Sequence, residues 1–209
     1  MRRLYPSGPH RASEHSPAAA LGLLGTAIVC DVLDGLGCRN SFLGPRVTSM
    51  WASAPIAGPA FTLTCGPASQ VPVEPYGVLF RALAEPQEGA ILVVEAGDLV
   101  SGVWGELLST AAIARGFVGV VTDGLTRDIT GITDLRFPVY ATGTSPLDSA
   151  GRQEFVSFGD SVTLGGVTIR AGDWVVADNL GAVVIPAEHL EQVIERGLIK
   201  MSGESTVRD

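Results

Sequence analysis

Residues 90–122 decide the fold and read AILVVEAGDLVSGVWGELLSTAAIARGFVGVVT. The segments 90–95 and 117–122 are continuous apolar runs, which is typical of strands covered on both faces. Between them a helix is predicted over about 105–114, with Gly116 as its stop. The sequence therefore predicts a strand–helix–strand unit with parallel strands and a right-handed crossover.

This unit predicts where a ligand binds. The helix and the returning strand have similar lengths, so the chain leaving residue 122 comes back beside the start of the helix. The first helical turn, 105–108, and the loop 123–128 should therefore meet beyond the carboxyl ends of the strands, together with Gly97 and Asp98. Open α/β sheets usually bind their ligands at this edge.

The rest of the chain predicts further elements on both sides of this unit. Apolar spacing from Pro17 to Gly37 predicts an amphipathic helix or a pair of short ones, and 56–65 predicts a strand entered through a Gly-Pro kink. Short helices and strands are expected at 76–83 (helix), 138–142, 154–158, 162–169, 174–178 and 182–185 (strands), and 187–199 (helix). The pattern indicates a layered α/β fold with a βαβ core and short antiparallel strands, not a regular doubly wound sheet.

Length favours one domain. The chain has 209 residues, which suffices for one sizeable core. Residues 1–16 lack hydrophobic periodicity and are expected to be a flexible tail, 17–200 a single catalytic domain, and 201–209 a C-terminal tail.

Composition limits the partners and the compartment. With 14 Lys plus Arg against 22 Asp plus Glu, the net charge of −8 argues against nucleic acid as a partner. Three cysteines without CxxC spacing, no signal peptide and no uninterrupted apolar stretch of membrane-spanning length predict a cytoplasmic protein that does not enter a membrane. Only 17% of residues are charged and 46% are hydrophobic, which suggests apolar surface hidden between subunits.

The predicted edge of the sheet gathers groups suited to a small acid. Free amides in the first turn of the helix, at residues 106–108, favour an anion, and Arg127 offers a planar fork for a carboxylate. Glu106, Asp123 and Asp128 offer hard oxygen ligands, so any metal would be Mg²⁺ or Mn²⁺ carrying several waters. A 2-oxo acid chelating such a metal would fit. Spacing alone is equally consistent with Glu106 as a favourable first-turn acid and Arg127-Asp128 as a surface pair, and Asp123 could simply anchor its turn.

The motifs GELLSTAA (105–112), GVVTDG (119–124) and Arg127-Asp128 resemble the RraA-like family, which includes the class II 4-hydroxy-4-methyl-2-oxoglutarate aldolases. Those aldolases carry an acid, 20 further residues and then Arg-Asp, as here Glu106 precedes 107–126 and Arg127-Asp128. The likeness extends through 25–31, 57–62 and 137–140, and so covers roughly residues 20–190.

The resemblance implies a swivelling β/β/α domain, assembled as a homotrimer or a dimer of trimers, that acts as a metal-dependent lyase. It would cleave a 4-hydroxy-2-oxo acid to pyruvate, with oxaloacetate decarboxylation as a side activity. The resemblance makes Asp128 the direct metal ligand and Glu106 the residue that orders metal-bound water. Arg127, Gly105 and the amides of Leu107 and Leu108 would hold the substrate. Asp31 sits where the aldolases place an acid that reaches a neighbouring subunit's site.

The sequence departs from those aldolases in one respect and leaves one alternative. Glu106 stands where the better-known aldolases have Asp, so the carboxylate is kept, and whether the extra methylene changes the substrate from 4-hydroxy-4-methyl-2-oxoglutarate to another 2-oxo acid is left open. The only lysine, Lys200, is far from the motif, which argues against Schiff-base chemistry. The alternative is a non-catalytic regulator of the RraA type that binds RNase E. A methyltransferase is disfavoured because no Gly-rich turn of the nucleotide-binding kind precedes a helix.

Overall fold

The structure, a computed structural model, describes residues 16–208 except 53, 72–75 and 85–86. Almost all of the expected tail at 1–16 lies outside the described residues. The helices are α1 (Pro17–Gly35), α2 (Gly77–Ala82), α3 (Glu106–Ile113), α4 (Ile129–Leu135), the 3-10 turn η1 (Ala187–His189) and α5 (Leu190–Arg208). The strands are β1 (Thr48–Trp51), β2 (Ile56–Pro67), β3 (Ile91–Glu95), β4 (Gly102–Trp104), β5 (Gly119–Thr122), β6 (Leu125–Thr126), β7 (Val139–Ala141), β8 (Gln153–Phe158), β9 (Val162–Leu164), β10 (Val167–Ile169), β11 (Trp174–Asp178) and β12 (Gly181–Ile185).

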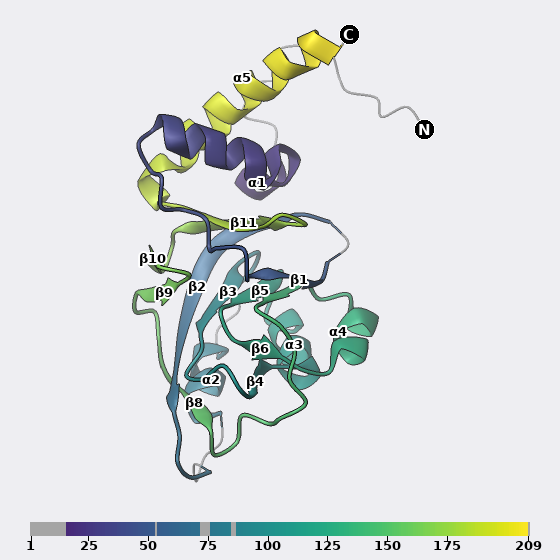
Figure 1. The fold of residues 1–209 in the computed structure, drawn as a ribbon, viewed down its shortest axis with the longest axis vertical. Coiled ribbons are helices and arrows are strands. Elements are labelled where there is room, and N and C mark those ends of the chain that lie inside the picture. Colours follow the sequence, from purple (N-terminus) through teal and green to yellow (C-terminus); the bar gives the residue numbers. More distant parts are fainter. Residues whose placement is uncertain (1–15, 53, 72–75, 85–86, 209) are drawn as a thin grey trace.

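One mixed sheet runs through the molecule in the order β1-β7-β5-β3-β2-β11-β12, and β8 pairs with the far end of β2. Its middle strands β2, β3, β5 and β7 are parallel, whereas β1, β8, β11 and β12 run antiparallel to their neighbours (Figure 1). The pairing of Ile91 with Gly119 and of Val94 with Thr122 confirms the predicted parallel strands.

The central strands are buried on both faces. Along β3, Leu92 and Val94 belong to a core cluster with residues of α2, α3 and α4, whereas Ile91 and Val93 face a second cluster with β9, β10 and β11. This two-sided burial explains why 90–95 lacks polar alternation. Helices α2, α3 and α4 therefore cover one face of the sheet, and further strands cover the other. This arrangement confirms the layered α/β class.

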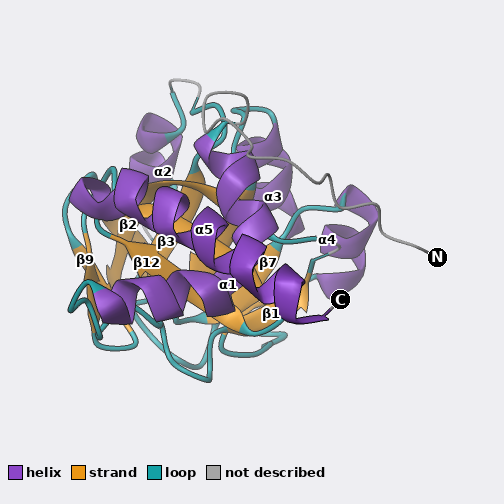
Figure 2. Ribbon diagram, turned by 90° about the horizontal axis from the view of Figure 1, so that it is seen from above, coloured by secondary structure: helices purple, strands orange, loops and turns teal. Residues whose placement is uncertain are grey.

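A second helical layer, α1 with α5, lies on β11 and β12 (Figures 1 and 2). Gly25 breaks α1 with a φ of +71°, and the Asp178 carboxylate accepts hydrogen bonds from Thr26 N–H and Oγ1 at 2.8 Å, so the expected pair of short helices is present. Among the described residues, α1 alone has the length and mean hydropathy of a membrane span. It packs Leu21 and Leu33 into the core, as the core helix of a globular protein does.

Four features differ from the sequence predictions. The segment 162–169 is a hairpin, β9–β10, because Gly165 and Gly166 turn the chain with positive φ. Helix α5 continues through 201–208, the predicted C-terminal tail, since Met201 extends the apolar stripe that packs on α1 and the strands. Helix α4 was not predicted, because its threonines and glycine have low helix propensity; the buried Ile132 stabilises it. The short strands β1, β4 and β6 were also missed.

Candidate active site

The strand pair β4–β6 places Arg127 at the candidate site. These strands are parallel, pairing Gly102 with Leu125 and Trp104 with Thr126. Arg127 N–H donates to the Trp104 carbonyl at 2.9 Å, which continues the ladder. The Arg127 side chain then lies across Gly102, where a methyl group would stand 3.2 Å from Arg127 Cβ and Cγ. A side chain at residue 102 would force the Arg127 side chain to shift by a few tenths of an ångström.

Asp128 has a strained backbone and a side chain turned away from its helix. It precedes α4 in the left-handed conformation, with φ 58° and ψ 38°, and its carboxylate makes no capping hydrogen bond. The carboxylate instead lies against Gly105, where a methyl group would stand 2.7 Å from Asp128 Oδ2. The same oxygen accepts Arg127 Nε at 3.2 Å, and this bond raises the pKa of Arg127.

A second carboxylate, that of Asp148, holds the other side of the guanidinium. Arg127 Nη1 lies 3.3 Å from Asp148 Oδ2. Asp148 is in the turn between β7 and β8, so nothing in its sequence neighbourhood pointed to the site, and sequence analysis missed it. The pKa of Asp148 is lowered, chiefly by a hydrogen bond from Ala150 N–H and further by Arg127.

Glu106 reaches the same corner from the first turn of α3. Its side chain is exposed, and its carboxylate lies against α4 at Gly131, where a methyl group would stand 2.5 Å from Glu106 Oε2. Arg127 and Asp128 thus lie against Gly105, and Glu106 is the next residue, with its carboxylate directed to Gly131 of α4. Leu107 is 82% exposed, and Leu108 lies on the same first turn, whose amides have no partner inside the helix.

An open cleft of about 450 Å³ adjoins these groups. Arg127, Asp128 and Ile129 form one side, and Thr144, Ser145 and Pro146 the other. A parallel bridge joins Thr126 to Thr144, and Ser145 Oγ donates to the Val100 carbonyl at 2.7 Å, so the second wall is fixed to the first. Thr144 and Ser145 could not be found from the sequence, since they follow a strand that carries no chemical motif.

Other candidate residues have structural positions. Asp123 Oδ1 accepts Ala96 N–H at 2.8 Å and so ties the end of β5 to the end of β3; burial raises the pKa of Asp123. Burial acts to raise the pKa of Asp98, but hydrogen bonds from Ser101 and Val100 N–H outweigh it and lower that pKa. Asp31 lies on α1, paired with Lys200 of α5 at 3.2 Å, and not beside Arg127 of the same chain.

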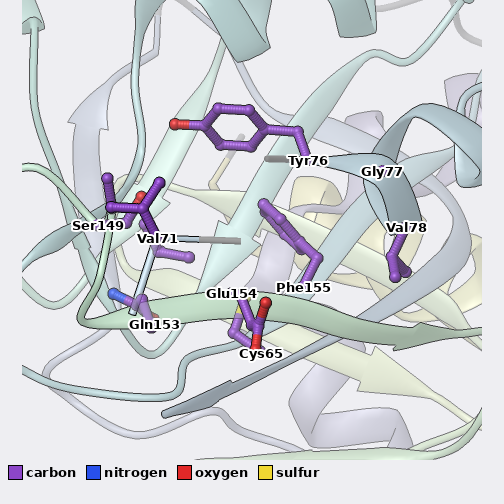
Figure 3. A pocket seen from close by; sticks show the side chains of 11 residues that line it. Cys65, Val71, Tyr76, Gly77, Val78, Ser149, Gln153, Glu154 and Phe155 are labelled. Carbon is purple, nitrogen blue, oxygen red and sulfur yellow. The ribbon is translucent and has the colours of Figure 1, made fainter. Parts of the chain in front are cut away.

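A smaller cavity of about 140 Å³ lies behind β4 (Figure 3). Tyr76, Phe155 and Glu154 line it together with Ser149 and Gln153 of the turn that follows Asp148. Cys65 also contributes to the lining, and burial raises the pKa of this thiol well above its usual range. A thiol with a raised pKa is a poor nucleophile, so Cys65 is a packing residue here.

The residues present suit a hard cation such as Mg²⁺ or Mn²⁺. Among the described residues, no group of three or more His, Cys, Asp or Glu side chains could enclose an ion. Asp128 supplies one carboxylate beside Gly105 and Glu106 a second beside Gly131, and Asp128 makes no capping hydrogen bond to α4. Mg²⁺ typically takes one or two carboxylates and keeps its waters, so these residues fit it.

Comparison with known proteins identifies the family. The model of the RraA-like family, described as Aldolase/RraA, matches residues 26–184, and the chain therefore belongs to the RraA-like family. The crystal structure of RraAS2 from Streptomyces coelicolor, described as an unusual member of the RNase ES inhibitor RraA protein family, superposes with a TM-score of 0.82 at 30% identity. That match covers 96% of this chain and 99% of RraAS2. The expected RraA-like fold is thereby confirmed.

Two relatives carry other names. A protein of Laribacter hongkongensis named "Putative 4-hydroxy-4-methyl-2-oxoglutarate aldolase" is 31% identical over 164 residues, which cover 76% of this chain and 96% of that protein. Protein DlpA of Legionella pneumophila is 29% identical over 176 residues, or 82% of this chain, but this chain spans only 28% of DlpA. The family thus includes proteins named as aldolases and proteins named as RNase inhibitors.

Proposed function

We propose that this chain is a divalent-metal-dependent lyase that cleaves a 4-hydroxy-2-oxo acid to pyruvate and a second oxo compound. We propose oxaloacetate decarboxylation as its side activity. The observation that carries the proposal is the contact of Arg127 with Asp128 beside Gly105, at the start of the helix that carries Glu106, with an open cleft lined by Arg127 and Asp128. The name of the Laribacter relative supports the same class of reaction.

Both reactions break the bond between C3 and C4 of a 2-oxo acid and leave its electron pair on the enolate of pyruvate. Retro-aldol cleavage releases the C4 fragment as an oxo compound once its hydroxyl has passed its proton to a water molecule acting as base, and decarboxylation releases CO₂. The enolate then takes a proton at C3 to give pyruvate. A site that binds a carboxylate and stabilises negative charge on an adjacent oxygen therefore serves both reactions.

The residues divide this task. Arg127 presents a planar fork to the substrate carboxylate and stabilises the developing enolate, and the first-turn amides of Leu107 and Leu108 provide a second hold on the anion. Asp128 would hold Mg²⁺ or Mn²⁺, and Glu106 would order its water. The ion supplies a Lewis acid for the 2-oxo group. Lys200, the only lysine, pairs with Asp31 on the α1–α5 layer, so a Schiff base at this site is disfavoured.

The second candidate function is a protein-binding regulator of an RNase, favoured by the similarity to RraAS2 along nearly the whole chain. A regulator has no need of a metal-binding carboxylate beside an arginine fork. The Asp128 carboxylate, which makes no capping hydrogen bond to α4 and lies against Arg127, also supports catalysis.

A coupled pyruvate assay separates the two. The purified chain is incubated with oxaloacetate or 4-hydroxy-4-methyl-2-oxoglutarate, first with EDTA and then with Mg²⁺ or Mn²⁺ in excess, and pyruvate is followed through lactate dehydrogenase. We expect release of pyruvate that EDTA abolishes and either metal restores. If neither metal gives pyruvate above the uncatalysed rate from either acid, the lyase proposal fails for these substrates. Inhibition of RNase E cleavage by the same preparation would then favour the regulator.

A further inference from the structure

The guanidinium of Arg127 lies between two carboxylates. Its Nε contacts Asp128 Oδ2 at 3.2 Å, and its Nη1 contacts Asp148 Oδ2 at 3.3 Å. A guanidinium has five N–H donors, so these contacts leave three of them, including both on Nη2. Three donors suffice for a bidentate hold on a substrate carboxylate.

Asp148 is itself firmly anchored. Its Oδ1 accepts Ala150 N–H at 3.1 Å, and Arg152 Nη1 donates to its carbonyl at 2.9 Å. A parallel bridge joins Asp148 to Gly102, whose N–H donates to the Leu147 carbonyl at 2.9 Å. Asp148 is therefore fixed to β4, the strand across which the Arg127 side chain lies.

Buried hydrogen bonds extend this anchor. Gln153, only 4% exposed, ends the turn that begins at Asp148. Its Oε1 accepts Gly97 N–H at 2.9 Å and its Nε2 donates to Ser101 Oγ at 2.9 Å. Figure 3 shows Gln153 and Ser149 at the wall of the smaller cavity, while Asp148 contacts Arg127. The turn is thus held by the core, and its one carboxylate, that of Asp148, contacts Arg127, which lines the cleft.

We propose that Asp148 is a positioning residue that holds Arg127 in the orientation in which it binds the substrate carboxylate. The inference rests on the proposed function in that it takes Arg127 as the carboxylate-binding group.

The direction in which KM changes when Asp148 is substituted distinguishes a positioning role from a purely electrostatic effect of its charge. A carboxylate near an anion site repels an anionic substrate, so removal of its charge alone would strengthen binding. Positioning predicts the opposite: in Asp148→Asn the guanidinium loses one partner, samples other rotamers and binds the substrate more weakly. Because Asp148 is half exposed, we expect KM to rise by about two- to fivefold, the range of exposed ion pairs.

The first experiment measures Arg127 directly, without metal or substrate. The metal-free protein is treated with phenylglyoxal, and modification of Arg127 is followed by peptide mass spectrometry. In Asp148→Asn we expect modification about two- to fivefold faster, because loss of an ion pair of this strength frees the guanidinium. Arg127 should be modified more slowly in Asp148→Glu than in Asp148→Asn. The control is Asp160→Asn, which removes one exposed carboxylate from the turn after β8. In this control Arg127 should be modified at the wild-type rate. Equal rates in Asp148→Asn and the wild type would overturn the proposal.

The second experiment is a double-mutant cycle on pyruvate release. Asp148→Asn should raise KM in the wild-type background and change it less in Arg127→Lys, whose ammonium lacks the planar fork. An equal change in both backgrounds, or a lower KM in Asp148→Asn, would overturn the positioning role. If the wild type releases no pyruvate at all, the proposed function fails, and the phenylglyoxal rates alone decide whether Asp148 positions Arg127.

Discussion

Asp128 combines strain and function at a single residue. The left-handed conformation costs a non-glycine residue about 1–3 kcal/mol, although Asp and Asn tolerate it better than most residues. An aspartate in this position directly before a helix would be expected to cap it, yet its carboxylate is directed to Arg127 and Gly105 instead. The conformation thus keeps one carboxylate available to the cleft.

Asp128→Asn tests the role of that carboxylate. Asn fits the same backbone, so the melting temperature should stay within about 2 °C of the wild type, as for surface substitutions in general. The charge is lost, however, and we expect kcat/KM for pyruvate release to fall at least about 100-fold, as for removal of a key electrostatic group. Steady-state measurements of kcat/KM across a Mg²⁺ titration test this expectation. A variant with normal activity and normal Mg²⁺ dependence would show that the metal binds elsewhere.

Gly105→Ala tests the fit between α3 and Asp128. The added methyl group would lie 2.7 Å from Asp128 Oδ2 and 3.2 Å from Arg127 Cγ, and both side chains can move. We therefore expect the protein to fold while kcat/KM drops about tenfold or more, because a small displacement of reacting groups is costly.

The matched control for Gly105→Ala is Gly22→Ala. Gly22 lies on α1 with open space around its missing side chain. Alanine there should raise stability by about 0.5–1 kcal/mol through better helix propensity and leave kinetics unchanged. If Gly105→Ala has wild-type kcat/KM, the close approach to Asp128 has no functional consequence.

At the scale of elements, the loop between β5 and β6 depends on Asp123. Its carboxylate bonds Ala96 N–H, and its carbonyl accepts Thr142 Oγ1 at 3.0 Å, so three strand ends are joined beside the site. Burial raises its pKa above the value of about 3.9 that an unfolded chain has. The charged form is therefore penalised in the folded state, and the wild type loses stability as pH rises through the folded pKa.

Asp123→Asn should remove this penalty while its side-chain oxygen still accepts Ala96 N–H. We expect the variant to melt above the wild type at pH 7, and the difference to shrink toward pH 4, because the raised pKa of Asp123 makes its neutral form more populated in the folded state as pH falls. Thermal melts followed by circular dichroism at pH 4, 5.5 and 7 measure this trend. A variant that melts below the wild type at pH 7 would mean that the hydrogen bond requires the full charge.

Sequence patterns predicted the elements that carry their own periodicity. The buried strands β3 and β5 and helix α3 came from continuous apolar runs and a glycine stop, and their meeting at Gly105 placed Arg127 and Asp128 beside Glu106. The strands β4 and β6 could not be predicted in this way. They contain three and two residues, and each is stabilised by pairing with a segment about 20 residues away.

The second wall of the cleft was unpredictable for a similar reason. Thr144, Ser145 and Asp148 lie in a connection that carries no repeating pattern, and they reach Arg127 only because β7 returns beside β5. Their place depends on tertiary structure. Residues of this kind can be found only once the sheet order is known.

At the scale of the whole molecule, Asp31 and Arg127 belong to different layers. Asp31 lies on α1, which packs with α5 on β11 and β12, whereas Arg127 follows β6 and leads into α4 on the other side of the sheet (Figure 1). Within one chain they do not meet. A role for Asp31 in catalysis therefore requires a second copy of the chain.

We expect the chain to assemble as a homotrimer or a dimer of trimers. Large apolar side chains stand exposed near the site, with Leu99 at 63% and Val100 at 60%, and only 17% of the residues are charged. Light scattering on a sizing column should give a mass of about three or six times the 21.7 kDa of one chain. A mass of one chain would contradict both the assembly and the shared site.

Complementation between two impaired variants tests whether the site is shared. Asp31→Asn and Asp128→Asn should each be inactive alone, because each site would need Asp128 from one subunit and Asp31 from its neighbour. When the two are unfolded together in equal amounts and refolded, random assembly gives both intact residues at about a quarter of the sites, so about a quarter of wild-type activity should return. Lys200→Met removes the ion pair with Asp31 and keeps the carboxylate, so it should remain active if the carboxylate acts in a neighbouring site. If Lys200→Met and Asp31→Asn lose activity equally, and mixing Asp31→Asn with Asp128→Asn restores none, then the role of Asp31 is only to join α1 to α5.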